Sequence, residues 1–313
     1  SELGADKGGW ARVTVVVTGS AGFLGSSLVA ELVTSGRRVV GVDRTPTDRP
    51  VDHLVLTGDL LHRDELVDTA LATADAVVHL AGCPGVRDSA GDVEHRRRRD
   101  NVAATARVLD AVPLDVPVVV ASSSSVYGGS QGRPIRESDR LAPRGGYARS
   151  KVAVERLCAR RAADGGRVTV VRPFTVVGEG QRPDMAVSRW LDAAEAGRPL
   201  QVYGSLERTR DLTDVRDVAR VLATLADPSV ATTGVLNLGT GRPHTLAEVV
   251  AAVAEVTGAD VRTVVTPAAS VEPADTWADT RALRATVGFV PRTDLVDVVA
   301  RQAAARPALA VTA

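Results

Sequence analysis

The sequence is poor in cysteine and has no excess of either charge. Two cysteines, Cys83 and Cys158, occur in 313 residues, which is too few and too widely spaced for a disulfide framework or a zinc knuckle. Thirty-eight Lys and Arg residues balance thirty-eight Asp and Glu residues. Because proteins that bind nucleic acid usually carry a basic excess, this balance argues against nucleic acid as a partner.

Long apolar runs are also missing. The sequence contains no run of about 18 apolar residues, which a membrane-spanning helix requires. The N-terminal residues lack the basic region and apolar run of a secretory signal. The five histidines have none of the spacings of a metal site. We therefore expect a cytoplasmic protein without a membrane segment or a bound metal.

Strand and helix patterns alternate through the first half of the chain. The valine run at residues 13–17 predicts a strand buried on both faces, and residues 22–35 then have apolar positions at helical spacing. Further strands are predicted at residues 38–42, 77–80, 116–121 and 167–171, and helices at 102–112 and 152–163. This alternation predicts an α/β fold, a Rossmann-type doubly wound parallel sheet with helices on both faces.

The pattern changes after about Pro173, where strand signals shorten and loops become richer in Gly, Pro and Arg. Helices are predicted at residues 185–196 and 245–257, and the Ala-rich tail after Arg301 is expected to fray. We expect an NAD-binding Rossmann domain over residues 10–175, with some later segments returning to it. A smaller C-terminal α/β lobe for substrate is expected over residues 176–313.

Two further features concern basic residues. Four arginines at residues 96–99 start a predicted helix, and we interpret them as a solvated or dimer-facing helix edge, with a phosphate or partner contact as the alternative. His79 falls within a strand run and is expected to be a core histidine whose ring is hydrogen-bonded.

A glycine-rich segment follows the first predicted strand and opens the first predicted helix. It reads Thr-Gly-Ser-Ala-Gly-Phe-Leu-Gly over residues 18–25. Glycines there permit a tight turn, close approach of the backbone to a diphosphate, and close packing of helix on strand. The N–H groups and dipole of the helix N-terminus favour the anion. The residues expected to contact the dinucleotide are Gly19, Gly22, Phe23, Leu24 and Gly25.

Two carboxylates follow the next strands. Asp43 ends the second strand, where it could accept both ribose hydroxyls and would repel a 2′-phosphate, which favours NAD over NADP. Arg44, directly after it, leaves NADP open. Asp59, followed by Leu60, could meet the adenine amino group; an N-cap for a helix starting near Arg63 is an equal alternative.

Tyr147 and Lys151 lie four residues apart, a spacing that places both side chains on one face of a helix. An ammonium beside a phenol lowers the pKa of the tyrosine from its usual value of about 10, which makes a general base usable near neutral pH. Four serines at residues 122–125 end the preceding strand, at the sheet edge where open α/β folds bind ligands. A plain polar turn is the alternative for these serines.

These motifs, in this order, resemble the extended short-chain dehydrogenase/reductase family over about residues 13–302. The resemblance implies an NAD-dependent enzyme that acts on a nucleotide sugar, and a homodimer. In such enzymes Tyr147 would be the base, Lys151 would bind the nicotinamide ribose and tune Tyr147, and Ser123 would hydrogen-bond the reacting oxygen. The resemblance also assigns Leu80, Ala81 and Gly82 to the coenzyme.

The residues beside Ser123 discriminate among family members. The family's 4,6-dehydratases carry an Asp-Glu pair just before Val-Tyr-Gly and its decarboxylases a Glu, whereas this chain has Ser124 and Ser125. Loss of water needs an acid that protonates the leaving hydroxyl. The serines therefore favour an epimerase, which needs only a redox group and a base.

A second segment points to an acidic sugar. Residues 174–185 are similar to UDP-glucuronate 4-epimerases, in which the Arg of Gln-Arg-Pro-Asp-Met binds the sugar carboxylate. Arg182 has that position here, and a guanidinium can bind a carboxylate through two parallel hydrogen bonds; a surface or phosphate arginine is the alternative. Residues 81–87 resemble the same group's Pro-Gly-Val-Arg loop, and Arg210 would contact the diphosphate. The resemblance thus assigns to the substrate Gly85, Arg87, Ser123, Ser124, Ser125, Thr175, Arg182, Tyr203 and Arg210.

The sequence therefore predicts an NAD-dependent epimerase that inverts C4 of a nucleotide sugar through a transient 4-keto intermediate. UDP-glucuronate, converted to UDP-galacturonate, is the expected substrate. The alternatives are a UDP-glucose 4-epimerase, another nucleotide-sugar epimerase or dehydratase of a tailoring pathway, and a non-catalytic NAD-binding protein.

Overall fold

The computed structural model describes residues 13–46, 52–85, 90–230 and 232–306, and this part of the chain divides into two compact units. The first unit contains the described residues up to Ser123, together with Gly145–Arg172 and Ala219–Leu236. The second contains Ser124–Arg144, Pro173–Val218 and the described residues from Asn237 onward.

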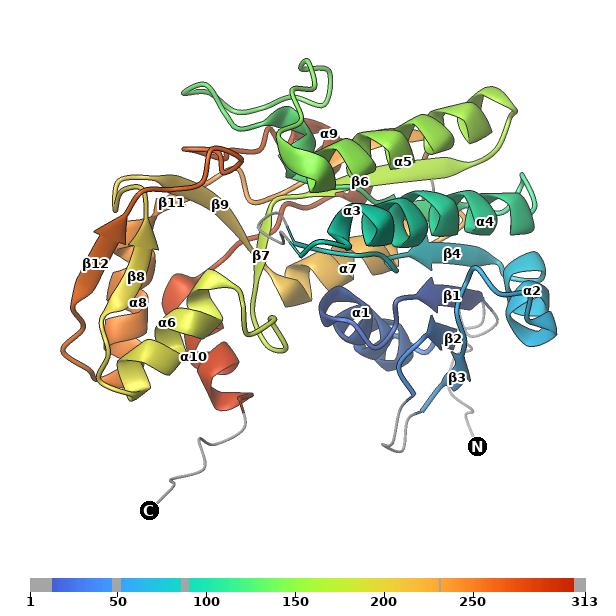
Figure 1. Ribbon diagram of the computed structural model, residues 1–313. Coiled ribbons are helices and arrows are strands. Elements are labelled where there is room, and N and C mark those ends of the chain that lie inside the picture. The colour runs from blue at the N-terminus through green and yellow to red at the C-terminus, as the bar shows by residue number, and fades with distance from the viewer. Residues whose placement is uncertain (1–12, 47–51, 86–89, 231, 307–313) are drawn as a thin grey trace, which may run out of the picture. The chain divides into compact units, whose positions relative to one another are not determined.

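The first unit is built on a seven-stranded sheet in the order β10-β6-β5-β4-β1-β2-β3 (Figure 1). Its strands are β1 (Thr14–Thr18), β2 (Arg38–Asp43), β3 (Leu54–Thr57), β4 (Ala76–His79), β5 (Val118–Ala121), β6 (Val168–Pro173) and β10 (Gly234–Leu238). The pairs from β3 through to β6 are all parallel. The Rossmann-type doubly wound sheet predicted from the sequence is thereby confirmed. Strand order reverses between β1 and β4, the position at which such sheets bind ligands.

The valines of this sheet are buried on both of its faces, because helices cover both faces. The helical elements are α1 (Phe23–Thr34), α2 (Glu65–Ala72), α3 (Val93–Arg96), η1 (Arg97–Ala103), α4 (Ala104–Ala111), α5 (Gly145–Ala163) and α7 (Val215–Leu225), the last of which begins in the second unit. On one face Val16 and Val77 share a core with Leu71 of α2, Val108 of α4 and Val154 of α5.

The helix predicted at residues 102–112 has a different start. Helical structure begins at Val93 and passes through the π-helical turn η1 before α4. A π turn accommodates one extra residue and is common at functional sites. Here it turns Asp100 and Asn101 inward, and both are buried. Hydrophobic periodicity did not predict the turn, because its inward-facing residues are polar.

Two more sequence predictions are corrected by helix bounds. α5 begins at Gly145 rather than at residue 152, so that Tyr147 and Lys151 both lie on it. The tail after Arg301 was expected to fray; α10 (Leu295–Ala304) continues past Arg301 to Ala304, and residues 307–313 lie outside the described residues. Val298 and Val299 are buried, and this apolar face holds the helix on the second unit's core.

The arginines at residues 96–99 form a solvated edge only in part, because Arg98 is exposed whereas Arg97 is buried. Arg97 is only 4% exposed, and it donates hydrogen bonds to Glu94 (2.6 Å) and to the carbonyl of Gly85 (2.8 Å). The expectation for His79 is confirmed, because its two ring nitrogens lie 2.7 and 3.0 Å from the hydroxyls of Thr18 and Thr105. Burial, assisted by the charge of Lys151, lowers the pKa of His79 to about 3.

The second unit has two small sheets. β9 lies between β11 and β7, and β12 pairs with β8. The elements are η2 (Ser124–Tyr127), β7 (Thr175–Val177), α6 (Ala186–Glu195), β8 (Leu200–Tyr203), β9 (Thr209–Asp214), β11 (Pro243–Thr245), α8 (Leu246–Thr257), β12 (Thr263–Thr266), α9 (Arg281–Val287) and α10. Trp190, Leu200, Val253 and Val298 belong to its core.

A buried carboxylate fixes the loops of this unit. Asp211 has no exposed surface. It accepts hydrogen bonds from the N–H groups of Thr240 (2.8 Å), Gly241 (3.0 Å) and Ala278 (3.0 Å). A buried charge requires such partners. Asp211 therefore links β9 to two segments that are distant in the sequence, one at Thr240 and Gly241 and one at Ala278.

Candidate active site

The glycine loop forms a backbone cradle between β1 and α1. Gly19 has φ +73°, and a Cβ on it would lie 2.7 Å from the backbone nitrogen of Ala81. A Cβ on Gly25 would lie 2.0 Å from the carbonyl oxygen of Gly19. Gly22 is the N-cap of α1 and has no side chain that could accept a hydrogen bond from the first N–H groups of the helix. Such a cradle suits the diphosphate of a dinucleotide, and this contact stays a prediction.

Asp43 stands at the carboxyl end of β2, beside the glycine loop. One carboxylate oxygen accepts the N–H of Ala21 (3.0 Å) and the other that of Thr45 (2.9 Å). A carboxylate has about four acceptor positions, so that both oxygens can still accept hydroxyl groups. This geometry is compatible with a contact between Asp43 and the ribose of the coenzyme, which stays a prediction.

The alternative interpretation of Asp59 as a helix N-cap is wrong. Asp64 caps α2 instead, and it accepts the N–H groups of Leu66 (2.9 Å) and Val67 (3.1 Å). Asp59 accepts the N–H of Leu61 (3.0 Å) and a hydrogen bond from Arg99. Burial alone would raise the pKa of Asp59, but these hydrogen bonds and the charges of the neighbouring arginines lower it.

The loop after β4 is held by Asn101, a residue that sequence reasoning missed. The side-chain oxygen of Asn101 accepts the N–H of Cys83 (2.7 Å), and its amide nitrogen donates to the carbonyl of Cys83 (3.2 Å) and to the hydroxyl of Ser150 (2.9 Å). A Cβ on Gly82 would lie 2.7 Å from that side-chain oxygen. Asn101 thus ties the expected coenzyme loop to α5.

The same stretch contains four other predicted site residues. Leu80 and Ala81 follow β4, and both donate to Thr18. The N–H of Leu80 donates to the Thr18 carbonyl (3.1 Å), and that of Ala81 donates to the Thr18 hydroxyl (3.4 Å). Gly85 has φ +109°. Arg87, predicted to contact the substrate, lies outside the described residues.

Tyr147 and Lys151 lie together on α5, with the Lys151 ammonium 5.9 Å from the centre of the Tyr147 ring. Lys151 donates a hydrogen bond of 2.8 Å to the carbonyl of Ala121, at the end of β5. Burial lowers the pKa of Lys151 to about 8, against the opposing effects of Cys158, Cys83 and Glu155.

One turn further along α5, Glu155 anchors the serine segment. Glu155 accepts a hydrogen bond from Ser122 (2.5 Å) and two from Arg172 of β6 (2.8 and 2.7 Å), and all three residues are buried. The strand end from which Ser123 follows is therefore fixed to the helix that carries Tyr147. Sequence reasoning did not single out Glu155, although its spacing of four from Lys151 was a signal.

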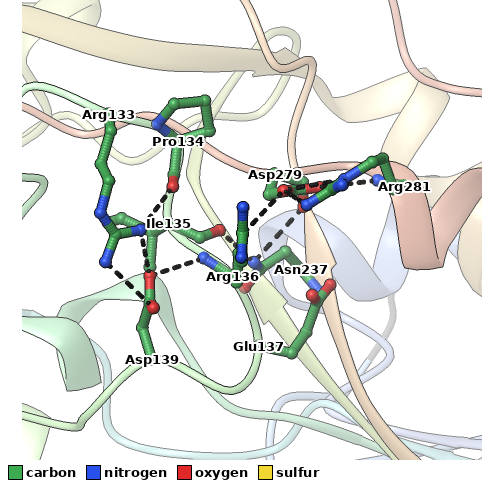
Figure 2. A network of polar contacts seen from close by, with 9 residues as sticks. All are labelled: Arg133, Pro134, Ile135, Arg136, Glu137, Asp139, Asn237, Asp279 and Arg281. Atoms are coloured by element: carbon green, nitrogen blue, oxygen red, sulfur yellow. Dashed lines mark hydrogen bonds and ion pairs between the residues drawn. The ribbon is translucent and has the colours of Figure 1, made fainter.

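In the second unit, Ser124 and Ser125 begin η2, and Asn237 fixes the end of this turn. The hydroxyl of Tyr127 donates to the side-chain oxygen of Asn237 (2.7 Å). The amide nitrogen of Asn237 donates to the carbonyl of Ile135 (2.8 Å), and its N–H donates to Glu137 (2.9 Å). Figure 2 shows Asn237 beside the segment with Ile135 and Glu137, near Asp279.

Arg182 lies in the segment between β7 and α6, which follows Thr175. Its guanidinium makes two parallel hydrogen bonds to Asp184 (2.8 and 2.6 Å). The next residue back, Gln181, is buried, and its side-chain oxygen accepts a hydrogen bond of 2.9 Å from Gln302 of α10. Gln302 also accepts the N–H of Gly178 (3.1 Å) and donates to Ser188 (2.9 Å).

The two remaining predicted substrate residues, Tyr203 and Arg210, lie on strands of the small sheets. Tyr203 ends β8. Arg210, on β9, donates to the carbonyls of Thr209 (2.8 Å), Ala274 (2.8 Å) and Pro273 (2.9 Å). Its expected contact with a diphosphate stays a prediction.

A family model described as "NAD dependent epimerase/dehydratase family" matches residues 15–239, which is most of the chain. The chain belongs to this family. Its coenzyme is therefore NAD, for which the glycine cradle and Asp43 supply a fitting site. None of the described helices is long and apolar enough to cross a membrane. The described residues contain no group of three His, Cys, Asp or Glu side chains that could hold a metal ion.

Relatives of this family member act on nucleotide sugars. A probable UDP-glucuronate 4-epimerase of Rhizobium meliloti (strain 1021) is 31% identical, over 91% of this chain and 94% of its own. MoeE5 in complex with UDP-glucuronic acid and NAD is 41% identical, with a TM-score of 0.84, over 93% of this chain and 98% of that one. The UDP-glucuronic acid 4-epimerase of Bacillus cereus, in complex with UDP-glucuronic acid and NAD, is 27% identical, with a TM-score of 0.86, over 94% and 98% of the two chains.

Proposed function

We propose that the chain is a UDP-glucuronate 4-epimerase that interconverts UDP-glucuronate and UDP-galacturonate. The observation that carries the proposal is the Tyr147–Lys151 pair on α5, fixed to the end of β5, with serines rather than carboxylates at residues 124 and 125. A tyrosine base can move the proton that accompanies hydride transfer, but without a neighbouring acid it does not expel water. MoeE5, with UDP-glucuronic acid bound, supports the choice of sugar.

The residues of this chain would handle the proton and the oxygen at C4. When bound, NAD supplies the acceptor, and then the donor, of the C4 hydride. Tyr147 takes the proton of the 4-hydroxyl and returns it after the 4-keto sugar has presented its opposite face. Lys151 stabilises the Tyr147 phenolate through its positive charge. Ser123 donates a hydrogen bond to the reacting oxygen in both directions.

Arg182 would protect the intermediate of an acidic sugar. The 4-keto form of such a sugar is a β-keto acid, which loses CO₂ when the breaking bond aligns with the carbonyl π system. A guanidinium that binds the carboxylate through two hydrogen bonds can keep it out of that alignment, with Thr175 and the serines of η2 as further donors. Arg182 already binds the carboxylate of Asp184 through two hydrogen bonds, which supports the proposal that it binds a sugar carboxylate in the same way.

The test is to incubate the purified protein separately with UDP-glucuronate, UDP-galacturonate and UDP-glucose and to identify products by NMR. We expect interconversion of the two acids, abolished in Tyr147→Phe. Arg182→Ala should raise KM for UDP-glucuronate at least about tenfold, a loss of about 1.4 kcal/mol, and leave KM for a neutral sugar within about twofold. Equal effects on acidic and neutral sugars would overturn the carboxylate assignment.

A 4-epimerase of neutral UDP-sugars is the second candidate. Arg182 already has a carboxylate partner in Asp184, and MoeE5 has also been solved with UDP-glucose and NAD. Turnover of UDP-glucose to UDP-galactose, with no change in UDP-glucuronate, would favour this candidate.

We also propose that the protein works as a cytoplasmic homodimer, as the family resemblance implies. Light scattering coupled to size-exclusion chromatography should give twice the chain mass of 32.6 kDa. A monomer mass at micromolar concentration would refute the dimer.

A further inference from the structure

The residue after Asp43 is already engaged by a carboxylate. The guanidinium of Arg44 donates to both oxygens of Asp100, at 3.2 Å each. Its side chain is 53% exposed, whereas that of Asp100 is 11% exposed. The pairing therefore attaches a surface guanidinium to a buried, fixed carboxylate. Asp59 is a second carboxylate partner of Arg44, at 3.9 Å.

The backbone around Asp100 explains why this carboxylate is fixed. Asp100 lies in η1, and the next residue, Asn101, is hydrogen-bonded to Cys83 and Ser150. Arg99 donates to Asp100 (2.5 Å) and also to Asp59. Asp100 is thus held by its neighbours in the chain. Because Arg99 donates to Asp59, Arg44 makes its two hydrogen bonds to Asp100.

Charge and geometry at this position bear on the choice between NAD and NADP. An arginine near the ribose is the group that accommodates the 2′-phosphate of NADP, because its planar fork matches phosphate oxygens. Among the described residues, the ion pairs here join Arg44 and Arg99 to Asp59 and Asp100. With Asp43, which precedes Arg44, these side chains carry three negative charges and two positive ones. A 2′-phosphate would therefore meet a net negative charge and an arginine whose donors point to Asp100.

We propose that Asp100 is a positioning residue that sets coenzyme selectivity: by pairing with Arg44 it withholds from a 2′-phosphate the guanidinium that would bind it. Asp43 favours the ribose hydroxyls of NAD directly, and Asp100 adds a second contribution by engaging the adjacent cation. Without Asp100, the same cluster has two carboxylates and two guanidiniums, and Arg44 is released.

The test measures binding of NAD⁺ and NADP⁺ by calorimetry to protein from which bound coenzyme has been exchanged out. Asp100→Ala should raise the affinity for NADP⁺ relative to NAD⁺ at least tenfold. The double variant Asp100→Ala/Arg44→Ala should lose that gain, whereas a merely structural effect of Asp100 would persist in it. Asp68→Ala removes another partly buried carboxylate paired with an arginine, Arg107, and should leave the ratio within twofold.

A second variant keeps the proposal testable if Asp100→Ala does not fold. In the otherwise unchanged protein, Arg44→Ala should alter the NADP⁺-to-NAD⁺ affinity ratio less than twofold, because Arg44 is already engaged. A loss of NADP⁺ affinity of tenfold or more in Arg44→Ala would overturn the proposal. So would an unchanged ratio in a folded Asp100→Ala protein.

Discussion

The ammonium of Lys151 lies 5.9 Å from the centre of the Tyr147 ring while it donates a hydrogen bond to Ala121 at the end of β5. Both the charge and the position of Lys151 are therefore tied to the sheet. Because burial lowers the pKa of Lys151 to about 8, the ammonium loses its proton in an accessible pH range. The proposed base then loses its stabilising charge.

We expect kcat/KM for epimerisation to fall above about pH 8 as Lys151 becomes neutral. Lys151→Met should lower kcat/KM about 10²- to 10⁴-fold, because Tyr147 loses the charge that it needs to act as general base. In Lys151→Arg the fall above pH 8 should vanish, since a guanidinium keeps its proton. Arg149→Met, an exposed cation on the same helix, is the control. A persisting alkaline fall in Lys151→Arg would assign it to another group.

His79 should make the folded state sensitive to acid. Its pKa is 6.5 when unfolded and about 3 when folded, so that between these values the unfolded chain binds more protons and stability falls as pH falls. The contribution is at most about 1.4 kcal/mol per pH unit. Urea unfolding of the wild type and His79→Gln at pH 7 and pH 5 should show a steeper loss for the wild type. His62→Gln, at an exposed position, should follow the wild type, and parallel losses in all three proteins would contradict the prediction.

Gln302 should affect sugar binding from the C-terminal helix. Its side chain is hydrogen-bonded to Gln181, which precedes Arg182, and to Gly178 and Ser188. Gln302→Leu removes these three hydrogen bonds from buried groups. Such losses cost about 1–3 kcal/mol each. We expect KM for UDP-glucuronate to rise about tenfold with kcat changed less than about threefold. Gln201→Leu removes hydrogen bonds to Val264 and Thr266 in the same unit and should leave KM unchanged. If kcat falls and KM does not, Gln302 acts on another step.

Asp184 should compete with an acidic substrate. The Asp184 side chain is 64% exposed in its ion pair with Arg182. Exposed ion pairs contribute about 0–1 kcal/mol to stability. Asp184→Asn should therefore tighten binding of UDP-glucuronate about two- to fivefold and leave UDP-glucose unaffected. Titration calorimetry with both sugars gives the comparison. Weaker binding of the acid in this variant would mean that Asp184 orients Arg182 instead of competing for it.

Local sequence predicted those parts of the site that depend on spacing within one element. The glycines of residues 19–25 and the pair Tyr147 and Lys151 each lie within one loop or one helix turn. The missed residues act through contacts that local periodicity does not encode. Asn101 reaches Cys83 across 18 residues, and Gln302 reaches Gln181 across 121. The π turn was missed for a related reason, because it interrupts the helical period on which the prediction relied.

The position of β10 at the edge of the first unit's sheet has a consequence for synthesis on the ribosome. β10 neighbours β6 in space but follows it by about 60 residues in the chain, so that translation at about 5–20 residues per second separates them by about 3–12 s. During that interval the outer edge of β6 has no neighbouring strand and could pair with another nascent chain. Slow codons between the two strands should therefore lower the yield of active protein, and co-expressed chaperones should restore it.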